Sequence, residues 1–156
     1  MAISRQVLFV DTSVLLRLIG TDGDDAAREI ASEFEQRSER GQQFVIPVTA
    51  VIEAGNRIAQ RASDRRRLAE RLARVLKAAS SAQPPWVVRA TTWNRQFVDE
   101  LLDGNSTGTD LITLVGDGRL GSGDVAILVE RDQFQRSTAH VDVRIWSLDD
   151  TLAAYG

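Results

Sequence analysis

Four acidic residues in this sequence stand at the end of an apolar run or close to the start of a predicted helix. They are Asp11, Glu53, Asp124 and Asp149. Carboxylates that are brought together repel one another and raise each other's pKa, so such a cluster is hard to maintain without a cation. Oxygen ligands of this kind select Mg²⁺ or Mn²⁺. Two such ions about 4 Å apart stabilise the attacking and leaving oxygens when a phosphodiester is hydrolysed.

Each acid on its own has a simpler interpretation. Asp11 and Asp124 are good N-cap residues for the helices that follow them. Glu53 places a negative charge near the positive end of a helix dipole, and Asp149 with its neighbour Asp150 could form a solvated turn. The metal hypothesis therefore requires that all four acids reach the same place in the fold.

Short β-branched and aromatic runs predict the strands that would position these residues. The strands are expected at residues 7–10, 44–48, 86–89 and 141–146. The expected helices cover residues 14–19, 24 to about 41, 50 to about 79 with a break near Ser63, 93–102 and 124–134. Thr49 and either Thr91 or Thr92 are the expected N-caps of two of these helices, and residues 111–115 form either a strand or a helical turn.

The alternation of strands and helices predicts βαβ units and a mostly parallel sheet. In open sheets of this kind, ligands bind beyond the carboxyl ends of the strands. Parallel topology would gather the four acids at that edge. The length of 156 residues makes a single domain over residues 1–156 the expected organisation.

The composition excludes several classes of site and of protein. Cysteine is absent, so there is no disulfide framework, no thiolate zinc site and no cysteine nucleophile. His140 is the only histidine, which leaves almost no material for histidine-based catalysis. The net charge of −3 provides no overall basic field that would attract nucleic acid. The first apolar run is too short for a signal peptide or a membrane span, so we expect a soluble, cytoplasmic protein.

Four stretches of the sequence resemble the motifs of PIN-domain ribonucleases, in the same order. They are LFVDTSVL at residues 8–15, VIPVTAVIE at 45–53, LGSGDVAIL at 120–128 and IWSLDDTL at 145–152. In the last stretch, Ser147 and Leu152 stand where the family has threonine and phenylalanine. The resemblance spans nearly the whole chain and implies a three-layer α/β/α, PIN-like (Rossmann-like) fold. It also implies a Mg²⁺- or Mn²⁺-dependent endoribonuclease, most often the VapC-type toxin of a bacterial toxin–antitoxin pair.

The resemblance further implies roles for individual residues. Asp11, Asp124 and Asp149 would hold metal, and Glu53 would bind a second ion or orient the attacking water. The side chains expected to support these carboxylates are Thr12, Ser13, Ser147 and Asp150, and Asp149 and Asp150 remain alternatives for the fourth acid. The implied partners are an RNA substrate and a protein antitoxin whose segment covers the acidic groove.

An arginine-rich stretch between residues 57 and 77 offers a positive surface. Arg57, Arg61 and Arg65 recur every four residues and would share one face of a helix. That face could simply be solvated; otherwise it would bind the phosphates of RNA or contact an acidic partner segment. Apolar positions in the same stretch could form a homodimer interface, and we expect a homodimer.

Two other functions fit parts of the sequence. A PIN-like module with an incomplete metal site would bind RNA or a protein partner without cleaving anything. A Rossmann-like nucleotide binder would use the G-x-G-x-x-G pattern formed by Gly116, Gly118 and Gly121. The chain that remains after Gly121 is too short for a dinucleotide-binding fold that starts there.

Overall fold

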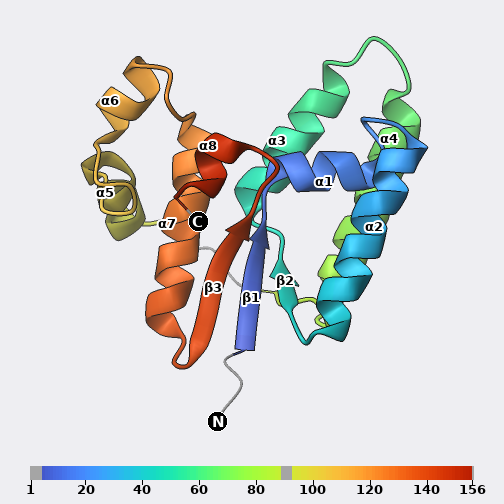
Figure 1. Cartoon of the computed structure of the whole chain (residues 1–156). Helices are drawn as coiled ribbons and strands as arrows, with labels where there is room; N and C mark the ends of the chain where they lie inside the picture. Colours follow the sequence, from blue (N-terminus) through green and yellow to red (C-terminus); the bar gives the residue numbers. More distant parts are fainter. Residues whose placement is uncertain (1–4, 89–92, 156) are drawn as a thin grey trace.

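The computed structural model describes residues 5–88 and 93–155. A three-stranded sheet lies at its centre, with both strand pairs parallel and the strands in the order β2-β1-β3. Helices cover both faces of this sheet, so the predicted α/β class with a parallel sheet is confirmed, in a three-layer arrangement (Figure 1). The strands are β1 (Arg5–Val10), β2 (Gln43–Val45) and β3 (Val141–Trp146).

Eight helices are found in the described residues. In chain order they are α1 (Thr12–Ile19), α2 (Asp24–Glu39), α3 (Val48–Ala59), α4 (Arg65–Ala79), α5 (Arg95–Asp103), α6 (Leu111–Gly116), α7 (Ser122–Ser137) and α8 (Asp150–Ala153). None of these described helices is both long and apolar enough to cross a lipid bilayer.

Strand β1 occupies the middle of the sheet because both of its faces are apolar. Its residues Val7, Leu8, Phe9 and Val10 are each at most 4% exposed. Side chains alternate between the faces of a strand, so Leu8 and Val10 pack into one core cluster with α1 to α4. Val7 and Phe9 pack into a second cluster with α6, α7 and α8. The sheet is therefore held between two separate cores.

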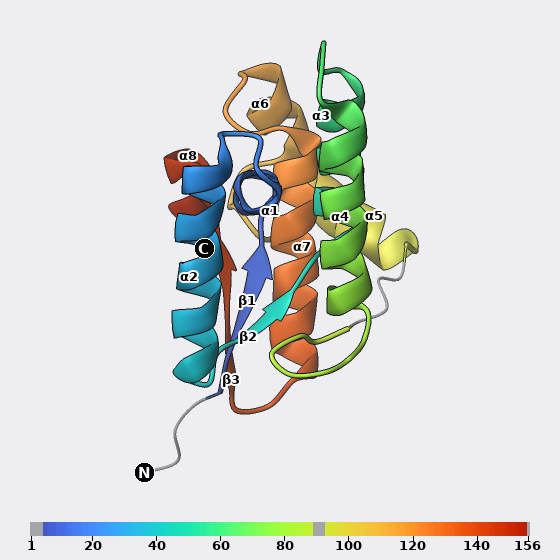
Figure 2. The same cartoon turned by 90° about the vertical axis from the view of Figure 1, so that its right-hand side faces the viewer.

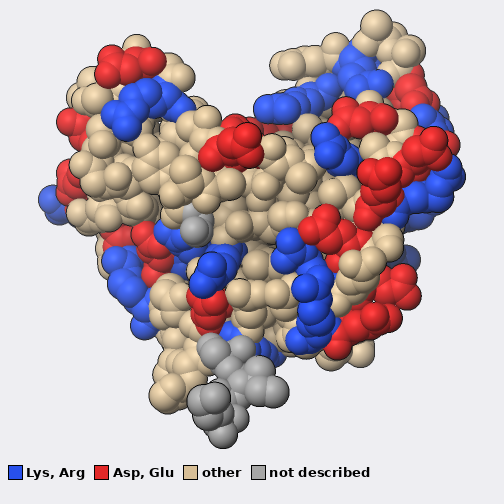
Figure 3. All heavy atoms as spheres, viewed as in Figure 1, with Lys and Arg blue, Asp and Glu red and all other residues tan. Residues whose placement is uncertain are grey.

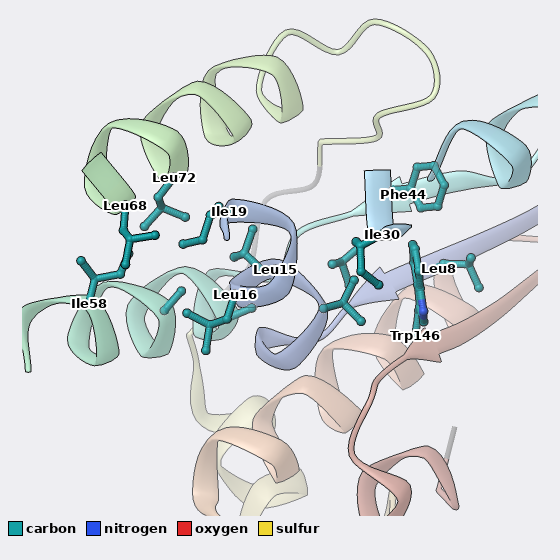
Figure 4. Close-up of a cluster of buried hydrophobic side chains, with 14 residues drawn as sticks. Leu8, Leu15, Leu16, Ile19, Ile30, Phe44, Ile58, Leu68, Leu72 and Trp146 are labelled. Carbon is teal, nitrogen blue, oxygen red and sulfur yellow. The ribbon is translucent and has the colours of Figure 1, made fainter. Parts of the chain in front are cut away.

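The first core attaches α1 to its neighbours. Leu15 and Ile19 of α1 point toward Leu68 and Leu72 of α4, while Trp146 packs near the sheet (Figure 4). The view turned by 90° shows α2 and α4 standing on either side of α1 (Figure 2). Because α1 follows β1 directly, this packing fixes the direction in which the chain leaves the sheet.

The carboxyl ends of β1 and β3 lie side by side. Val10 is in register with Trp146, and the Asp11 amide donates a 3.0 Å hydrogen bond to the Trp146 carbonyl. The two chains therefore leave the sheet together, toward α1 and α8 respectively. Residues 147–149 are thus placed next to Asp11, although they are more than 130 positions away in the sequence.

Several expected element boundaries are confirmed. Gly20 ends α1 in a left-handed conformation, with φ of 103°. The expected helix from 50 to 79 is divided into α3 and α4, and the break includes Asp64, whose φ of 64° cannot continue a helix. The open choice at residues 111–115 is decided in favour of a helix, α6, which Asp110 caps.

Other boundaries were predicted wrongly. Strand β2 ends at Val45, and Pro47 rather than Thr49 is the N-cap of α3, because proline has no N–H to donate to a sheet. The expected strand at 86–89 is reduced to one bridge between Phe44 and Trp86. Arg89, together with the expected caps Thr91 and Thr92, lies outside the described residues, and the N-cap of α5 is Asn94.

Candidate metal site at the sheet edge

A polar pocket of about 520 Å³ opens where β1 and β3 end, and all four predicted acids line it. Asp11 and Asp149 precede α1 and α8, whereas Glu53 belongs to α3 and Asp124 to α7. Figure 3 shows acidic atoms at the bottom of a hollow in the upper surface, with basic atoms on its right-hand rim. Four segments that are distant in the sequence therefore meet at the carboxyl edge of the sheet.

Asp11 lies deepest of the four acids, with 4% of its surface exposed. Its Oδ2 atom accepts hydrogen bonds of 2.8 Å from the hydroxyl of Ser13 and of 2.8 Å from that of Ser147, and a longer one of 3.4 Å from the Ser13 amide. All three bonds end on the same oxygen. These bonds orient the carboxylate and leave its other oxygen, Oδ1, available to coordinate a cation.

The two serine hydroxyls also hold the segment that carries Asp149. The amide of Leu148 donates to Ser13 Oγ at 2.9 Å, and the amide of Asp149 donates to Ser147 Oγ at 3.0 Å. Each hydroxyl thus accepts a backbone hydrogen bond and donates to Asp11. The neighbouring Thr12 is buried, and its Oγ1 has no hydrogen-bond partner among the described residues. Ser13 and Ser147, rather than Thr12, contact the Asp11 carboxylate.

Glu53 is half-buried, and burial is the main reason that its pKa is raised above the usual value. The negative charges of Asp124 and Asp11 raise this pKa further, while the Arg57 guanidinium lowers it. Its Oε1 atom is buried and has no hydrogen-bond partner among the described residues. The side chain fits only because residue 123 is glycine, since a β-carbon at Gly123 would collide with Oε1.

Asp124 stands in the first turn of α7 and is also half-buried. Burial raises its pKa, and a hydrogen bond of 3.2 Å from the Gly121 amide opposes that shift. The charges of Asp11 and Asp149 add to the rise, and Arg57 again lowers the pKa. The mutual effects on the pKa values indicate that the four carboxylates share one electrostatic environment.

Three of the four acids also accept backbone hydrogen bonds at helix starts. Asp11 and Asp149 are the N-caps of α1 and α8. The expectation that Asp124 is an N-cap was wrong, because α7 begins at Ser122 and its N-cap is Gly121. Asp11 accepts from the Ser13 amide, Asp124 accepts from the Gly121 amide, and Asp149 accepts from the Thr151 amide at 2.9 Å. These acids therefore form hydrogen bonds at helix starts and also meet in one pocket. Glu53 is the acid whose position no cap explains, because it lies in the second turn of α3 with an oxygen left unpaired.

The pocket suits a hard divalent cation in the chemistry of its donors. It offers carboxylate oxygens that repel one another, together with the unpaired Oε1 of Glu53, and Mg²⁺ or Mn²⁺ binds such oxygens. Within residues 5–88 and 93–155, however, no three acidic or histidine side chains already stand as a preformed metal cage. A cation would have to draw the carboxylates around the pocket toward itself.

The raised pKa of Glu53 predicts that this residue destabilises the folded, metal-free protein increasingly as pH rises. When the pKa of a carboxyl is higher in the folded than in the unfolded state, its contribution to stability is full below the unfolded pKa and is lost as pH rises through the folded pKa. In EDTA, the melting temperature of Glu53→Gln should therefore match wild type near pH 4 and exceed it increasingly toward pH 8. Thermal melts over this range measure the difference, and equal melting temperatures at pH 8 would contradict it.

The arginines predicted to bind RNA do not share one face. Arg57 of α3 lines the acidic pocket. Arg61 lies in the turn after α3, and Arg65 begins α4 and lines a different groove between the two helices. The expectation of a common face was wrong because α3 ends at Ala59, so the spacing of four residues no longer describes a single helix.

Sequence reasoning missed two charged residues on the pocket wall. Arg17, in the last turn of α1, and Asp22, in the turn that follows, both line the pocket. Arg17 lies in the short helix that Asp11 caps, and Asp22 follows that helix closely. This was the available signal, because a short helix keeps both of its ends near the site. Asp149 lines the pocket, whereas Asp150 is exposed at the start of α8 and does not.

The glycine-rich pattern between Gly116 and Gly121 does not form a nucleotide-binding loop. A dinucleotide fingerprint requires a strand before the loop and a helix after it. Here Gly116 ends α6 and Gly121 caps α7, so the pattern joins two helices. The nucleotide-binding alternative therefore loses its structural basis.

No family model, curated protein or solved structure matches this chain. Its function must be inferred from the pocket and from the chemistry of the residues that line it.

Proposed function

We propose that this chain is a divalent-metal-dependent endoribonuclease that hydrolyses RNA phosphodiester bonds, with a PIN-like fold. The observation that supports this most is the environment of Glu53. A half-buried carboxylate with an unpaired oxygen, in a pocket that four more acids line, requires a positive charge to balance it. A divalent cation supplies that charge and suits these oxygen donors.

Each residue of the pocket would have a distinct role. Asp11, Asp124 and Asp149 would hold one cation, and Glu53 would hold a second or orient the attacking water. A bound Mg²⁺ or Mn²⁺ would activate water and stabilise the negative charge that builds up on the phosphate. Ser13 and Ser147 would keep the Asp11 carboxylate oriented through their hydrogen bonds to Oδ2. The amides of residues 148 and 149 would in turn hold the two serine hydroxyls in place.

The biological setting that we propose is a cytoplasmic toxin of a type II toxin–antitoxin pair. A protein antitoxin would cover the acidic pocket, and Arg57 at its edge would bind an RNA phosphate. We also propose a homodimer. Val48, Ile52 and Trp93 leave an exposed apolar surface beside α3 in the described part of the chain, and sedimentation of the purified protein measures the oligomeric state.

One observation favours a second candidate function. Because no three carboxylates stand as a preformed cage in the described residues, a PIN-like module that binds RNA or a protein without cleaving it fits the same pocket. Asp11→Asn and Asp124→Asn separate the two functions. Both variants should lose metal-dependent cleavage if the chain is an enzyme, whereas a binding module shows no cleavage to lose and keeps its binding.

Cleavage should depend strictly on a divalent cation. Purified protein incubated with defined single-stranded RNAs should cut them in Mg²⁺ or Mn²⁺ and leave them intact in EDTA, because the carboxylates alone supply no positive charge to the reacting phosphate. Gel analysis of end-labelled RNA measures this. Asp11→Asn, prepared in parallel, controls for contaminating nucleases. Cleavage by wild type in EDTA equal to that in Mg²⁺ or Mn²⁺ would contradict the metal-dependent mechanism.

A further inference from the structure

Two arginines from different helices line the acidic pocket. Arg17 belongs to the last turn of α1, and Arg57 belongs to α3. Five carboxylates, Asp22 among them, line the same pocket and would repel a phosphate. Cationic groups on its walls therefore decide where a phosphodiester can approach.

Arg17 is held in a defined orientation. Its Nε atom donates to Asp22 Oδ2 at 3.1 Å, and its side chain remains 40% exposed. This contact uses one edge of the guanidinium. Within the described residues, Nη1 and Nη2 of Arg17 have no hydrogen-bond partner, so both remain able to bind two oxygens of one phosphate.

The turn that carries Asp22 is itself anchored on both sides. Gly20 closes α1 with a left-handed conformation, and the amide of Gly23 donates to the Gly20 carbonyl at 3.2 Å. From α4, Nη1 of Arg71 donates to the Ile19 carbonyl at 3.2 Å and pairs with Asp24 at 3.0 Å. The position of Asp22 is thus set by the packing of α4 against the end of α1.

Building on the proposed ribonuclease function, we propose that Arg17 binds a backbone phosphate of the RNA beside the one that is cleaved. Asp22 is then a positioning residue that orients the Arg17 guanidinium. Together with Arg57, Arg17 provides a second phosphate contact from a different wall of the pocket. The RNA strand would be held between α1 and α3, with its scissile bond above the carboxylates.

Arg17 also has an ordinary structural interpretation. A cation in the last turn of a helix is favourable there, and an exposed pair with aspartate adds little to stability. A purely structural role would change the melting temperature and leave RNA affinity alone. Affinity and its dependence on salt therefore distinguish the two roles.

The experiment measures binding without cleavage. Fluorescence anisotropy follows the full chain as it binds a fluorescein-labelled single-stranded RNA of mixed sequence in EDTA, at a series of NaCl concentrations. Arg17→Ala should weaken binding about tenfold. It should also reduce the slope of log Kd against log salt by about 0.7, the value for the loss of one phosphate contact to a single strand.

Two further variants test the geometry. Arg17→Lys keeps the charge, so it should restore the salt slope but only part of the affinity, because lysine cannot make the bidentate contact. Asp22→Asn replaces the ion pair with a weaker neutral hydrogen bond and also removes one negative charge from the pocket. Binding weaker than wild type, despite that reduced repulsion, supports the positioning role of Asp22, and equal or tighter binding contradicts it. Arg28→Ala is the matched control: Arg28 forms a similar exposed pair with Asp25 on α2, away from the pocket, and its loss should change neither quantity.

The outcomes separate this proposal from the proposed catalysis. If Arg17→Ala alters affinity and slope no more than Arg28→Ala does, Arg17 has no role in binding phosphate, and if wild type itself does not bind the RNA in EDTA, the metal-independent contact proposed here is absent. That conclusion holds whether or not the protein cleaves RNA in Mg²⁺. If binding depends on Arg17 but no cation supports cleavage, the binding role stands and the nuclease activity fails.

Discussion

Replacing Glu53 by glutamine is expected to lower metal-dependent RNA cleavage by about 100-fold, which corresponds to about 2.7 kcal/mol of transition-state stabilisation. The amide keeps the size of the side chain and removes the charge that would bind a cation or orient water. The same change should raise the melting temperature in EDTA at pH 8, because burial and the neighbouring carboxylates make the Glu53 anion costly, as its raised pKa indicates. A gain in stability together with a loss of activity is the mark of a functional residue.

The control for this variant is Glu29→Gln. Glu29 is exposed on α2, outside the pocket, so its substitution makes the same change in charge without touching the site. Cleavage should stay at the wild-type level. Addition of Mg²⁺ should raise the melting temperature of wild type and of Glu29→Gln, and should raise that of Glu53→Gln much less. Full activity in Glu53→Gln would refute the role that we propose for Glu53.

Alanine at position 123 should also lower cleavage, by about 100-fold, although this residue contributes no functional group. A β-carbon there would meet Oε1 and Cδ of Glu53, which form the flexible end of that side chain. The carboxylate would move aside, and the fold would be retained, because alanine is a better helix former than glycine in α7. Single-turnover cleavage rates, with melting temperatures measured in parallel, test this expectation.

Gly55→Ala provides the comparison for Gly123→Ala. Gly55 lies in α3, two positions after Glu53, and an added β-carbon would meet nothing within 4 Å. We expect it to leave cleavage unchanged and to stabilise the helix by about 0.5–1 kcal/mol. If Gly123→Ala cleaves RNA as fast as Gly55→Ala does, the position of the Glu53 carboxylate is not critical, and the pocket works by another route.

Much of the fold could be predicted from local patterns in the sequence. The run of four apolar residues at 7–10 indicated a strand buried on both faces, and β1 is that strand. The glycine at 20 and the polar turn near Asp64 marked helix ends, because their conformations interrupt the helical repeat. Such signals involve residues close in sequence, whose effect on the backbone depends little on the rest of the chain.

The same local reasoning failed where the outcome depended on a boundary. Arg57, Arg61 and Arg65 have helical spacing, but the helix ends at Ala59, so only Arg57 reaches the acidic pocket. The strand expected at 44–48 stops at Val45, because Pro47 starts the next helix. A displacement of two or three residues at an element's end is enough to send a side chain to a different surface.

The pattern of residues alone indicated a parallel sheet, with acids at the ends of its strands or near the starts of its helices, and such positions favour the carboxyl edge of the sheet. The surroundings of these acids are set by packing between elements that are far apart in the chain. The burial of Glu53 depends on α3 packing against Gly123 of α7, and the position of the Asp22 turn, which orients Arg17, depends on the contacts of α4 with the end of α1. These contacts join residues that are distant along the chain, so no local pattern encodes them, and packing sets both the charge balance and the donors of the site.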